Sequence, residues 1–376
     1  MSKVIIGADF VPTVSNKNLF INGQVDELIG KELVTVLKDS DCRIFNLEVP
    51  LTDNSTPIDK NGPSLRADTA TIAGFKALEV NLFTLANNHI LDQGEQGLLS
   101  TIKVLENNQI NYVGVGTEDT ASKPFFFEFN EKTIGVYACA EHEFSIVGDK
   151  FSIGANPFDF LNTFDEIAEL KSQCDYVIVL YHGGKELYRY PSPNLQKVCR
   201  RIVDKGADLV VCQHSHCIGC EENYKNSKIV YGQGNFLFDL TENEYWQTSL
   251  LISITENFEI EYIPLVKNGA SIIKANDEHS KKILDDFYRR SEDIKAEGFI
   301  EKNYANFSKK YLTQYLMAIS GIRYGFISKV LNKMTKGRYM ERKIKRRFDR
   351  KKLLTILNYI ECEAHRELLI KGLTNE

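Results

Sequence analysis

The first 275 residues alternate short apolar runs with amphipathic stretches. Apolar, β-prone runs predict strands at residues 3–8, 42–47, 81–85, 175–180 and 208–212. Between them, residues 94–107 and 192–205 carry apolar side chains at helical spacing. Strands that alternate with helices predict an α/β fold with a layered, largely parallel sheet.

The pattern changes along the second half of the chain. Residues 228–238 predict a strand broken by Gly232 and Gly234, and residues 248–255 and 258–264 predict an antiparallel pair at the sheet edge. Residues 277–298, 303–331 and 339–371 predict helices. We therefore expect an α/β domain over residues 1–275 and a helical, basic extension over residues 276–376.

Composition is that of a globular protein, with 43% hydrophobic and 26% charged residues. The net charge of -5 hides a basic stretch, because residues 323–352 hold thirteen Lys or Arg against two acids. A solvated helical face is one interpretation of this stretch, and binding to an anionic membrane surface or a synthesis complex is another. No nucleic-acid-binding motif accompanies it, so we expect no nucleic-acid partner.

The N-terminal sequence lacks the apolar stretch of a secretory signal, and no run reaches the roughly 18–20 apolar residues that span a bilayer. The eight cysteines are scattered, which favours free thiols in a reducing compartment, with a zinc site at Cys217 and Cys220 as the alternative. We expect a cytoplasmic protein, with peripheral attachment at the inner face of the membrane as the variant that the basic helices suggest.

Polar side chains suited to metal binding follow five of the predicted strands. They are Asp9, Glu48, Asn88, His182, His214 and His216. Ligands bind outside the carboxyl ends of strands in α/β sheets, so these side chains are expected to converge on one crevice. A mixed set of carboxylates and imidazoles suits manganese, iron or zinc better than calcium. We predict one or two divalent ions, with Glu48 as the bridge between two.

The segment around Asn88 offers further chemistry. Asn88 has two interpretations, a metal ligand or a cap of the helix that follows. His89 is suited to protonate a leaving group because an unperturbed imidazole titrates near neutrality. Asp92 is predicted to orient His89, as carboxylates often do for catalytic imidazoles.

Several of these stretches resemble, in order along residues 3–265, the CapA family of bacterial capsule and poly-γ-glutamate synthesis proteins. The most specific are Asn87-Asn88-His89-Ile90-Leu91-Asp92-Gln93-Gly94, Gln213-His214-Ser215-His216 and Gly234-Asn235-Phe236-Leu237-Phe238-Asp239. That family is similar in fold to the calcineurin-like metallophosphoesterases. The resemblance implies a four-layer αββα sandwich with a central metal site and a role in polymer or envelope synthesis.

The resemblance also suggests substrate contacts. Lys60 and Arg66 stand in a family loop and would meet an anionic substrate, with plain surface charge as the alternative. Glu186 is a candidate catalytic partner or a solvated carboxylate. Asn235 and Asp239 would fix the turn at Gly232–Gly234 or contact substrate.

Two departures from the family pattern affect the site. Val11 stands where phosphoesterases of this class place a histidine, so one metal position lacks an imidazole. Gly183 replaces an aromatic residue that follows the histidine equivalent to His182.

These observations predict a metal-dependent hydrolase in capsule, poly-γ-glutamate or polysaccharide biosynthesis. A metal-activated water would attack a phosphoester bond or an amide bond. The substrate would be an anionic polymer, a phosphoester or a peptide-like molecule. A non-catalytic binding or assembly component and a metal-assisted epimerase are the alternatives.

Overall fold

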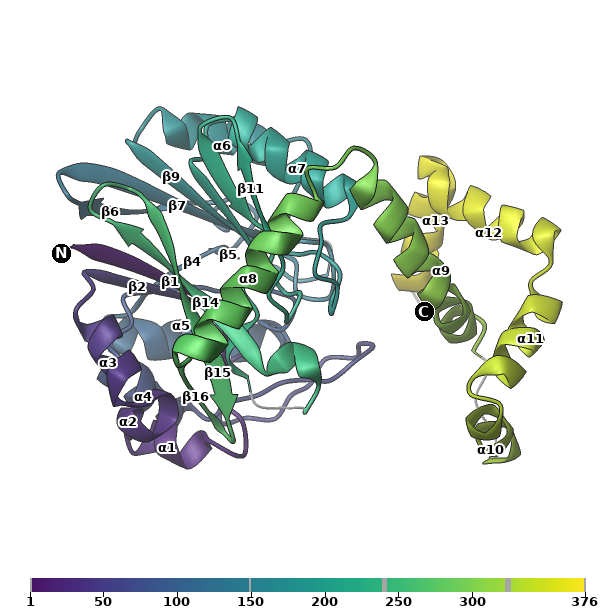
Figure 1. Ribbon diagram of the computed structural model, residues 1–376, viewed down its shortest axis with the longest axis horizontal. Coiled ribbons are helices and arrows are strands. Elements are labelled where there is room, and N and C mark those ends of the chain that lie inside the picture. The colour runs from purple at the N-terminus through teal and green to yellow at the C-terminus, as the bar shows by residue number, and fades with distance from the viewer. Residues whose placement is uncertain (1, 149, 239–241, 322–325, 375–376) are drawn as a thin grey trace. The chain divides into compact units, whose positions relative to one another are not determined.

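The computed structural model describes residues 2–148, 150–238, 242–321 and 326–374 of the 376-residue chain. The chain divides into two compact units, Met1–Ile300 and Glu301–Glu376. The first unit contains two stacked sheets and the second contains helices (Figure 1).

The larger sheet of the first unit has eight strands in the order β16-β15-β14-β1-β2-β3-β4, with β13 paired to the end of β1. β1 to β4 are parallel, whereas β14, β15 and β16 are antiparallel. The strands are β1 (Lys3–Val11), β2 (Cys42–Leu47), β3 (Leu82–Thr84), β4 (Asn111–Val113), β13 (Asn235–Phe238), β14 (Thr248–Thr255), β15 (Ile260–Asn268) and β16 (Ser271–Lys274).

The smaller sheet has six strands in the order β11-β12-β10-β9-β7-β6. Its four central strands are parallel, and β6 and β11 are antiparallel edges. The strands are β6 (Phe125–Phe129), β7 (Lys132–Ala140), β9 (Tyr176–His182), β10 (Leu209–Gln213), β11 (Glu221–Tyr224) and β12 (Ser227–Val230). A separate two-stranded ladder joins β5 (Val115–Gly116) to β8 (Gly154–Ala155).

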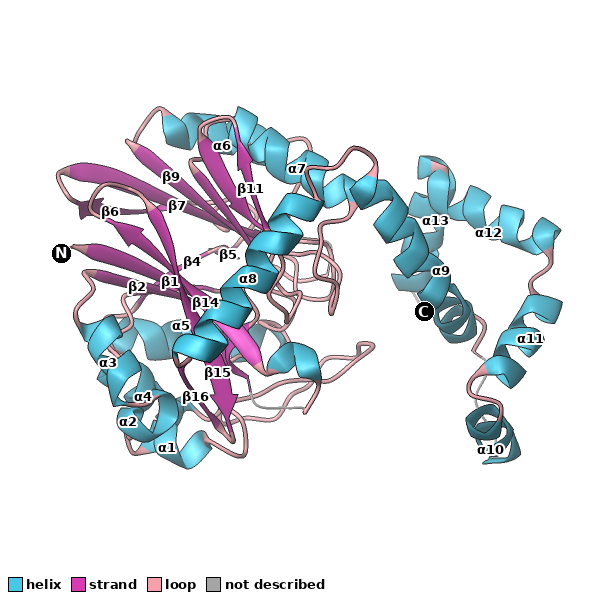
Figure 2. Cartoon of the chain, in the orientation of Figure 1, coloured by secondary structure: helices cyan, strands magenta, loops and turns pink. Residues whose placement is uncertain are grey.

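The two sheets pack face to face, and helices cover both outer faces (Figures 1 and 2). Ile6 and Ile44 of the larger sheet share one buried cluster with Ile178 and Val211 of the smaller sheet. The larger sheet is covered by α1 (Lys17–Ile21), α2 (Val25–Ile29), α3 (Lys31–Lys38), the 3-10 turn η1 (Thr69–Thr71), α4 (Ile72–Ala77) and α5 (Gly94–Asn107). The smaller is covered by α6 (Thr163–Lys171) and α7 (Pro193–Asp204). The expected four-layer αββα sandwich is confirmed.

The strands are apolar on both faces because each sheet lies between a helical layer and the other sheet. In β2, all six residues are buried. Central parallel strands buried in this way give continuous apolar runs rather than an alternating pattern. This burial explains why the strands were recognisable in the sequence, and why the sequence did not show that they belong to two sheets.

The break expected at Gly232 and Gly234 is confirmed, whereas the edge position expected for the antiparallel pair is wrong. Residues 228–238 form two strands in different sheets, β12 and β13, and the chain crosses between them at Gly232 and Gly234, which have φ of 118° and 81°. Such positive φ values are readily adopted by glycine. The pair β14 and β15 is not at the edge, because β14 lies beside β1 and β16 forms the edge.

The first unit ends at Ile300, beyond the boundary expected near residue 275. Helix α8 (Asp277–Asp293) contacts β15 and β11, and its fully buried Phe287 packs in a cluster with Leu250 and Ala275. Asn276 caps the helix by accepting a hydrogen bond from the His279 backbone N–H at 2.9 Å. α8 is therefore part of the sandwich unit.

The second unit consists of helices, as its sequence pattern predicts. They are α9 (Phe299–Ile319), which begins just before the unit, α10 (Phe326–Met334), α11 (Arg338–Arg347), α12 (Arg350–Glu361) and α13 (Glu363–Thr374). The helix expected over residues 339–371 is thus three helices, and the one expected over 303–331 includes residues 322–325, which lie outside the described part. Asp349 begins α12 by accepting from the Lys352 N–H at 3.0 Å. Among the described residues, no helix combines the length and apolar character that a membrane span needs.

Candidate metal centre

The six predicted metal ligands meet where strands of the two sheets end. The larger sheet supplies Asp9 near the end of β1, Glu48 directly after β2 and Asn88 shortly after β3. The smaller sheet supplies His182 at the end of β9, and His214 and His216 after β10. The carboxyl ends of both parallel strand sets therefore contribute to one buried site.

Two groups of ligand atoms share Glu48. The first group contains Glu48, His182 and His214, and the second contains Asp9, Glu48 and His216. Within each group the potential ligand atoms lie within 4.8 Å of one another. A carboxylate common to both groups is the arrangement that a bridged pair of cations requires.

In the first group, the His182 Nε2 atom is the centre of a tight cluster. It lies 3.0 Å from Asn88 Oδ1, 3.1 Å from His214 Nδ1 and 3.3 Å from Glu48 Oε1. Asn88 therefore adds a fourth donor to this group. Asn88 does not cap the following helix, because the N-cap residue of α5 is Gln93.

In the second group, His216 lies between two oxygen atoms. Its Nδ1 is 3.2 Å from Asp9 Oδ2 and 2.8 Å from Asn235 Oδ1. The His216 ring also packs against the Trp246 ring, with centroids 4.9 Å apart. Asn235, predicted as a substrate contact, is thus brought to the site as a partner of His216.

The electrostatic environments of His214 and His216 differ. Burial lowers the pKa of His214 well below its usual value, and the neighbouring His182 and His216 lower it further. Burial also acts to lower the pKa of His216, but the Glu48 and Asp9 carboxylates outweigh it and raise that pKa to about 9. At neutral pH without a cation, His214 is therefore neutral and His216 is protonated.

The site fits a divalent cation. Glu48 and Asp9 are completely buried. Within the described part of the chain, neither Glu48 carboxylate oxygen accepts a hydrogen bond. A buried carboxylate without hydrogen bonds is costly unless a cation compensates it. Imidazole nitrogens and carboxylate oxygens suit manganese, iron or zinc.

Asn46 joins the two groups, and the sequence analysis missed it. Its Nδ2 donates to Asp9 Oδ1 at 2.7 Å and lies 3.2 Å from His182 Nδ1. Its Oδ1 accepts from Asn87 Nδ2 at 3.0 Å, which fixes the orientation of the amide. The signal available in the sequence is spacing, because Asn46 and Glu48 are two residues apart along an extended segment and share a face.

His89 is held by a carboxylate beside the metal ligands. Its Nδ1 lies 2.6 Å from Asp92 Oδ2, which also accepts from the Leu65 backbone N–H at 2.5 Å. The Lys60 ammonium forms an ion pair with the other oxygen of Asp92 and lies 3.3 Å from His89 Nδ1. The structure thus brings Lys60, His89 and Asp92 into one buried cluster.

Arg66 and Glu186 make no contact with the metal ligands. The Arg66 guanidinium donates to the Thr52 and Asp53 carbonyls at 3.2 and 3.0 Å, and it lines a pocket of about 270 Å³ with Val11. Glu186 is 48% exposed, and its contact is Lys185 at 3.7 Å. Asp239 lies outside the described residues.

The chain is similar in sequence to known bacterial capsule synthesis proteins. The sequence profile described as "Bacterial capsule synthesis protein PGA_cap" matches residues 13–240. The capsule biosynthesis protein CapA of Bacillus anthracis is 29% identical over 230 residues, which are 58% of this chain and 56% of that protein. The PGA biosynthesis protein CapA of Bacillus subtilis is 26% identical over 259 residues, 66% of this chain and 68% of that protein. The chain thus spans little more than half the length of the first of these relatives.

Among solved structures, the NAD nucleotidase of Haemophilus influenzae is 15% identical, with a TM-score of 0.44 over 82% of this chain and 66% of that one. A 5'-nucleotidase from Candida albicans is 11% identical, with a TM-score of 0.40 over 82% of this chain and 58% of that one. The expected family resemblance is confirmed by the profile, which covers more than half of the chain. The chain therefore belongs to the PGA_cap family of bacterial capsule synthesis proteins.

Proposed function

We propose that this protein is a metal-dependent hydrolase that acts in the synthesis of an anionic capsule polymer such as poly-γ-glutamate, on a phosphoester or an amide. The observation that carries the proposal is the pair of ligand groups sharing Glu48, whose buried oxygens have no hydrogen-bond donor among the described residues. Membership of the capsule synthesis family supplies the biological context.

Six residues would hold the cation or cations. Glu48, Asn88, His182 and His214 would form one position, and Asp9, Glu48 and His216 the other. A divalent ion bound there would polarise the scissile group and make water a better nucleophile at neutral pH. The protein's own contribution is a buried, pre-organised set of donors, which costs little reorganisation during reaction.

His89 is the proposed proton donor to the leaving group. Asp92 accepts from Nδ1 and so fixes the tautomer, which leaves Nε2 as the ring atom that can serve a substrate. Lys60 neutralises Asp92 and contributes positive charge near an anionic substrate.

The test combines metal analysis with a hydrolysis screen. Purified protein would be analysed for manganese, iron and zinc, then assayed with bis(p-nitrophenyl) phosphate and a γ-glutamyl p-nitroanilide. His89→Gln should lower turnover by about 10²- to 10⁴-fold while metal content stays unchanged, because the ring is a proton donor rather than a ligand. His365→Gln, at an exposed histidine of α13, is the matched control. Equal turnover of His89→Gln and the wild type would reject the proposed acid.

One observation favours a non-catalytic binding component as the second candidate. The second ligand group has three donors, and Val11, two residues beyond Asp9, brings no imidazole. A metal-loaded protein that turns over neither substrate class yet binds oligoglutamate would support this candidate over the hydrolase.

We also propose that the second unit holds the protein at an anionic surface, either the inner face of the cytoplasmic membrane or a synthesis complex. A pocket of about 860 Å³ within this unit is lined by five basic side chains, Lys336, Arg338, Arg342, Lys343 and Arg346. Clustered basic residues bind anionic lipid surfaces through long-range attraction. Co-sedimentation with phosphatidylglycerol vesicles, and none with phosphatidylcholine vesicles, is the expected result.

A further inference from the structure

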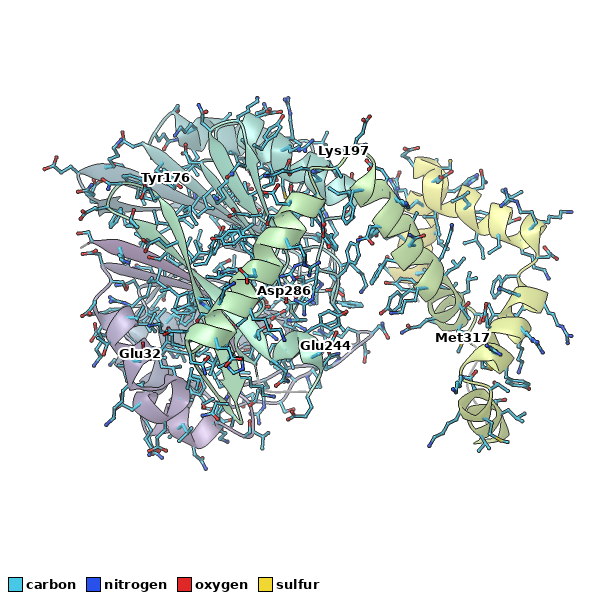
Figure 3. The ribbon with its side chains drawn as sticks, in the orientation of Figure 1. Glu32, Tyr176, Lys197, Glu244, Asp286 and Met317 are labelled. Carbon is cyan, nitrogen blue, oxygen red and sulfur yellow. The ribbon has the colours of Figure 1, made fainter. Side chains whose placement is uncertain are left out.

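A second polar pocket lies at the same end of the smaller sheet as the metal centre. Its volume is about 490 Å³, and its lining includes Arg189, Ile218, Glu244, Asp286 and Arg290. Arg189 follows the strand that ends at His182, and Ile218 is two residues beyond His216. Figure 3 labels Asp286 on α8 and Glu244 in the 3-10 turn η2 (Glu244–Trp246).

The lining is rich in positive charge. It contains four permanent cations, Arg189, Lys282, Arg289 and Arg290, against the two acids Glu244 and Asp286. Arg289 is neutralised, because its guanidinium lies 2.9 Å from Asp286 and 3.9 Å from Asp293. Within the described ranges of the chain, no carboxylate lies within 4.0 Å of the side-chain nitrogens of the other three cations.

Two of the unpaired guanidinium groups are fixed by backbone carbonyls. Arg189 Nη1 donates to the Ile218 carbonyl at 2.9 Å, and its guanidinium lies 4.7 Å from the centre of the Tyr245 ring. Arg290 is 6% exposed, and its Nε donates to the Gly219 carbonyl at 2.7 Å.

The positively charged Arg189 and Arg290 guanidinium groups therefore lie close together in the lining of the pocket. Burial lowers the pKa of Arg290, and the neighbouring Arg189 lowers it further. The Asp286 carboxylate offsets part of this repulsion, but the lining still holds more positive than negative charge. An anion that enters the pocket would reduce the repulsion that remains.

We infer that this pocket is an anion-binding subsite that holds a carboxylate of an acidic polymer substrate. The inference rests on the proposed function, since it locates where the anionic polymer of that hydrolase would bind. Guanidinium groups form paired, parallel hydrogen bonds with carboxylate or phosphate, and a fixed guanidinium loses little entropy in doing so. A volume of about 490 Å³ accommodates several atoms beyond one carboxylate, as a polymer segment requires.

The subsite is connected to the metal centre through η2. Glu244 of this turn lines the pocket, whereas Trp246 packs on the ring of His216. Trp246 is the one tryptophan in the sequence. Its fluorescence therefore offers a label-free signal from the 3-10 turn that contributes Glu244 to the pocket.

The test is a binding titration with the full chain. A γ-linked hexaglutamate would be titrated while Trp246 fluorescence and heat are recorded, and inorganic phosphate would be titrated in parallel. Arg189→Gln should weaken hexaglutamate binding by about 10- to 100-fold, because a charge-assisted pair is lost. Arg201→Gln removes the same charge from the outer face of α7, where the side chain is 56% exposed, and should change affinity less than about twofold.

Lys282→Gln provides a second variant at an exposed position of α8, where folding is not at risk. It should weaken hexaglutamate binding by about three- to tenfold, as expected for a more solvated cation. The subsite is wrong if both Arg189→Gln and Lys282→Gln bind hexaglutamate as the wild type does. It is equally wrong if phosphate binds as tightly as hexaglutamate and displaces it, since the pocket would then serve a free phosphate.

Glu48→Gln separates this inference from the proposed hydrolase. The variant should retain hexaglutamate affinity within about threefold, because Glu48 is not part of the pocket lining. Binding that depends on Arg189 but without turnover in the wild type would keep the subsite and reject the hydrolase. Turnover by the wild type, together with an unchanged hexaglutamate affinity in Arg189→Gln, would keep the hydrolase and reject the subsite.

Discussion

The two ligand groups on either side of Glu48 are built differently. The first has four donors, with Asn88, His214 and Glu48 all within 3.3 Å of His182 Nε2. The second has three, and Nδ1 of its histidine already lies 2.8 Å from an amide oxygen. Four donors are a complete set for a tightly held ion, whereas three leave a position open. We therefore propose one strong and one weaker cation position.

The protonation states of the histidines reinforce this comparison. Imidazole must be neutral to bind a metal. His214 in the first group meets this condition at neutral pH because burial lowers its pKa, while the carboxylates around His216 raise its pKa to about 9. In the metal-free protein the proton on His216 thus offsets the charge of Asp9.

Replacement of the shared carboxylate should have the largest effect. We expect Glu48→Gln to lose metal from both positions and turnover below detection, as measured by elemental analysis and hydrolysis of the best substrate. Glu186→Gln, at an exposed carboxylate, is the control, and undiminished metal content in Glu48→Gln would refute the bridging role.

Single histidine variants should separate the two positions. His182→Ala should lose the tightly held ion and reduce turnover by about 10³-fold or more. The variant lacks the imidazole around which the other three ligands of this group gather. His216→Ala should retain one ion per chain. Metal stoichiometry after dialysis checks both, and equal losses in the two variants would show that the positions are not different.

Loss of the connecting amide should have a smaller effect. Asn46→Ala removes the contacts to Asp9 and His182 but no ligand atom, so metal affinity should fall by about 10- to 100-fold. Competition with a chelator of known affinity measures the change. An affinity equal to that of the wild type would mean that Asn46 does not orient the ligands.

The smallest expected change is a gain in metal affinity at the second position, formed by Asp9, Glu48 and His216. Val11→His would add an imidazole beside a pocket of about 270 Å³, which offers room for the larger ring. The second ion should bind about tenfold more tightly, within the range by which neighbouring groups modify metal affinity. Thr13→His, which lines the same pocket two residues later, serves as the matched control. If both variants bind the second ion alike, the position of Val11 has no special relation to Asp9.

The sequence alone predicted the layered α/β class because strands buried on both faces are continuous apolar runs. It also identified the ligand candidates by their positions after those runs, and the structure brings six of them together. Spacing places Asn46 on the same face as Glu48, but its contacts could not be predicted, because Asp9 and His182 reach it from two different sheets. Arg290 was equally hidden, since a charged residue in a helix is usually solvated and only packing showed it to be buried.

Ligands of the first group come from both layers of β-structure, and this has a consequence for folding. A cation held by Glu48 and His182 would tie one sheet to the other, so its binding energy would add to global stability by mass action. The ion should then slow the exchange of backbone amide hydrogens in both β2 and β9. The metal concentration in the cell would then affect the lifetime of the folded protein as well as its activity.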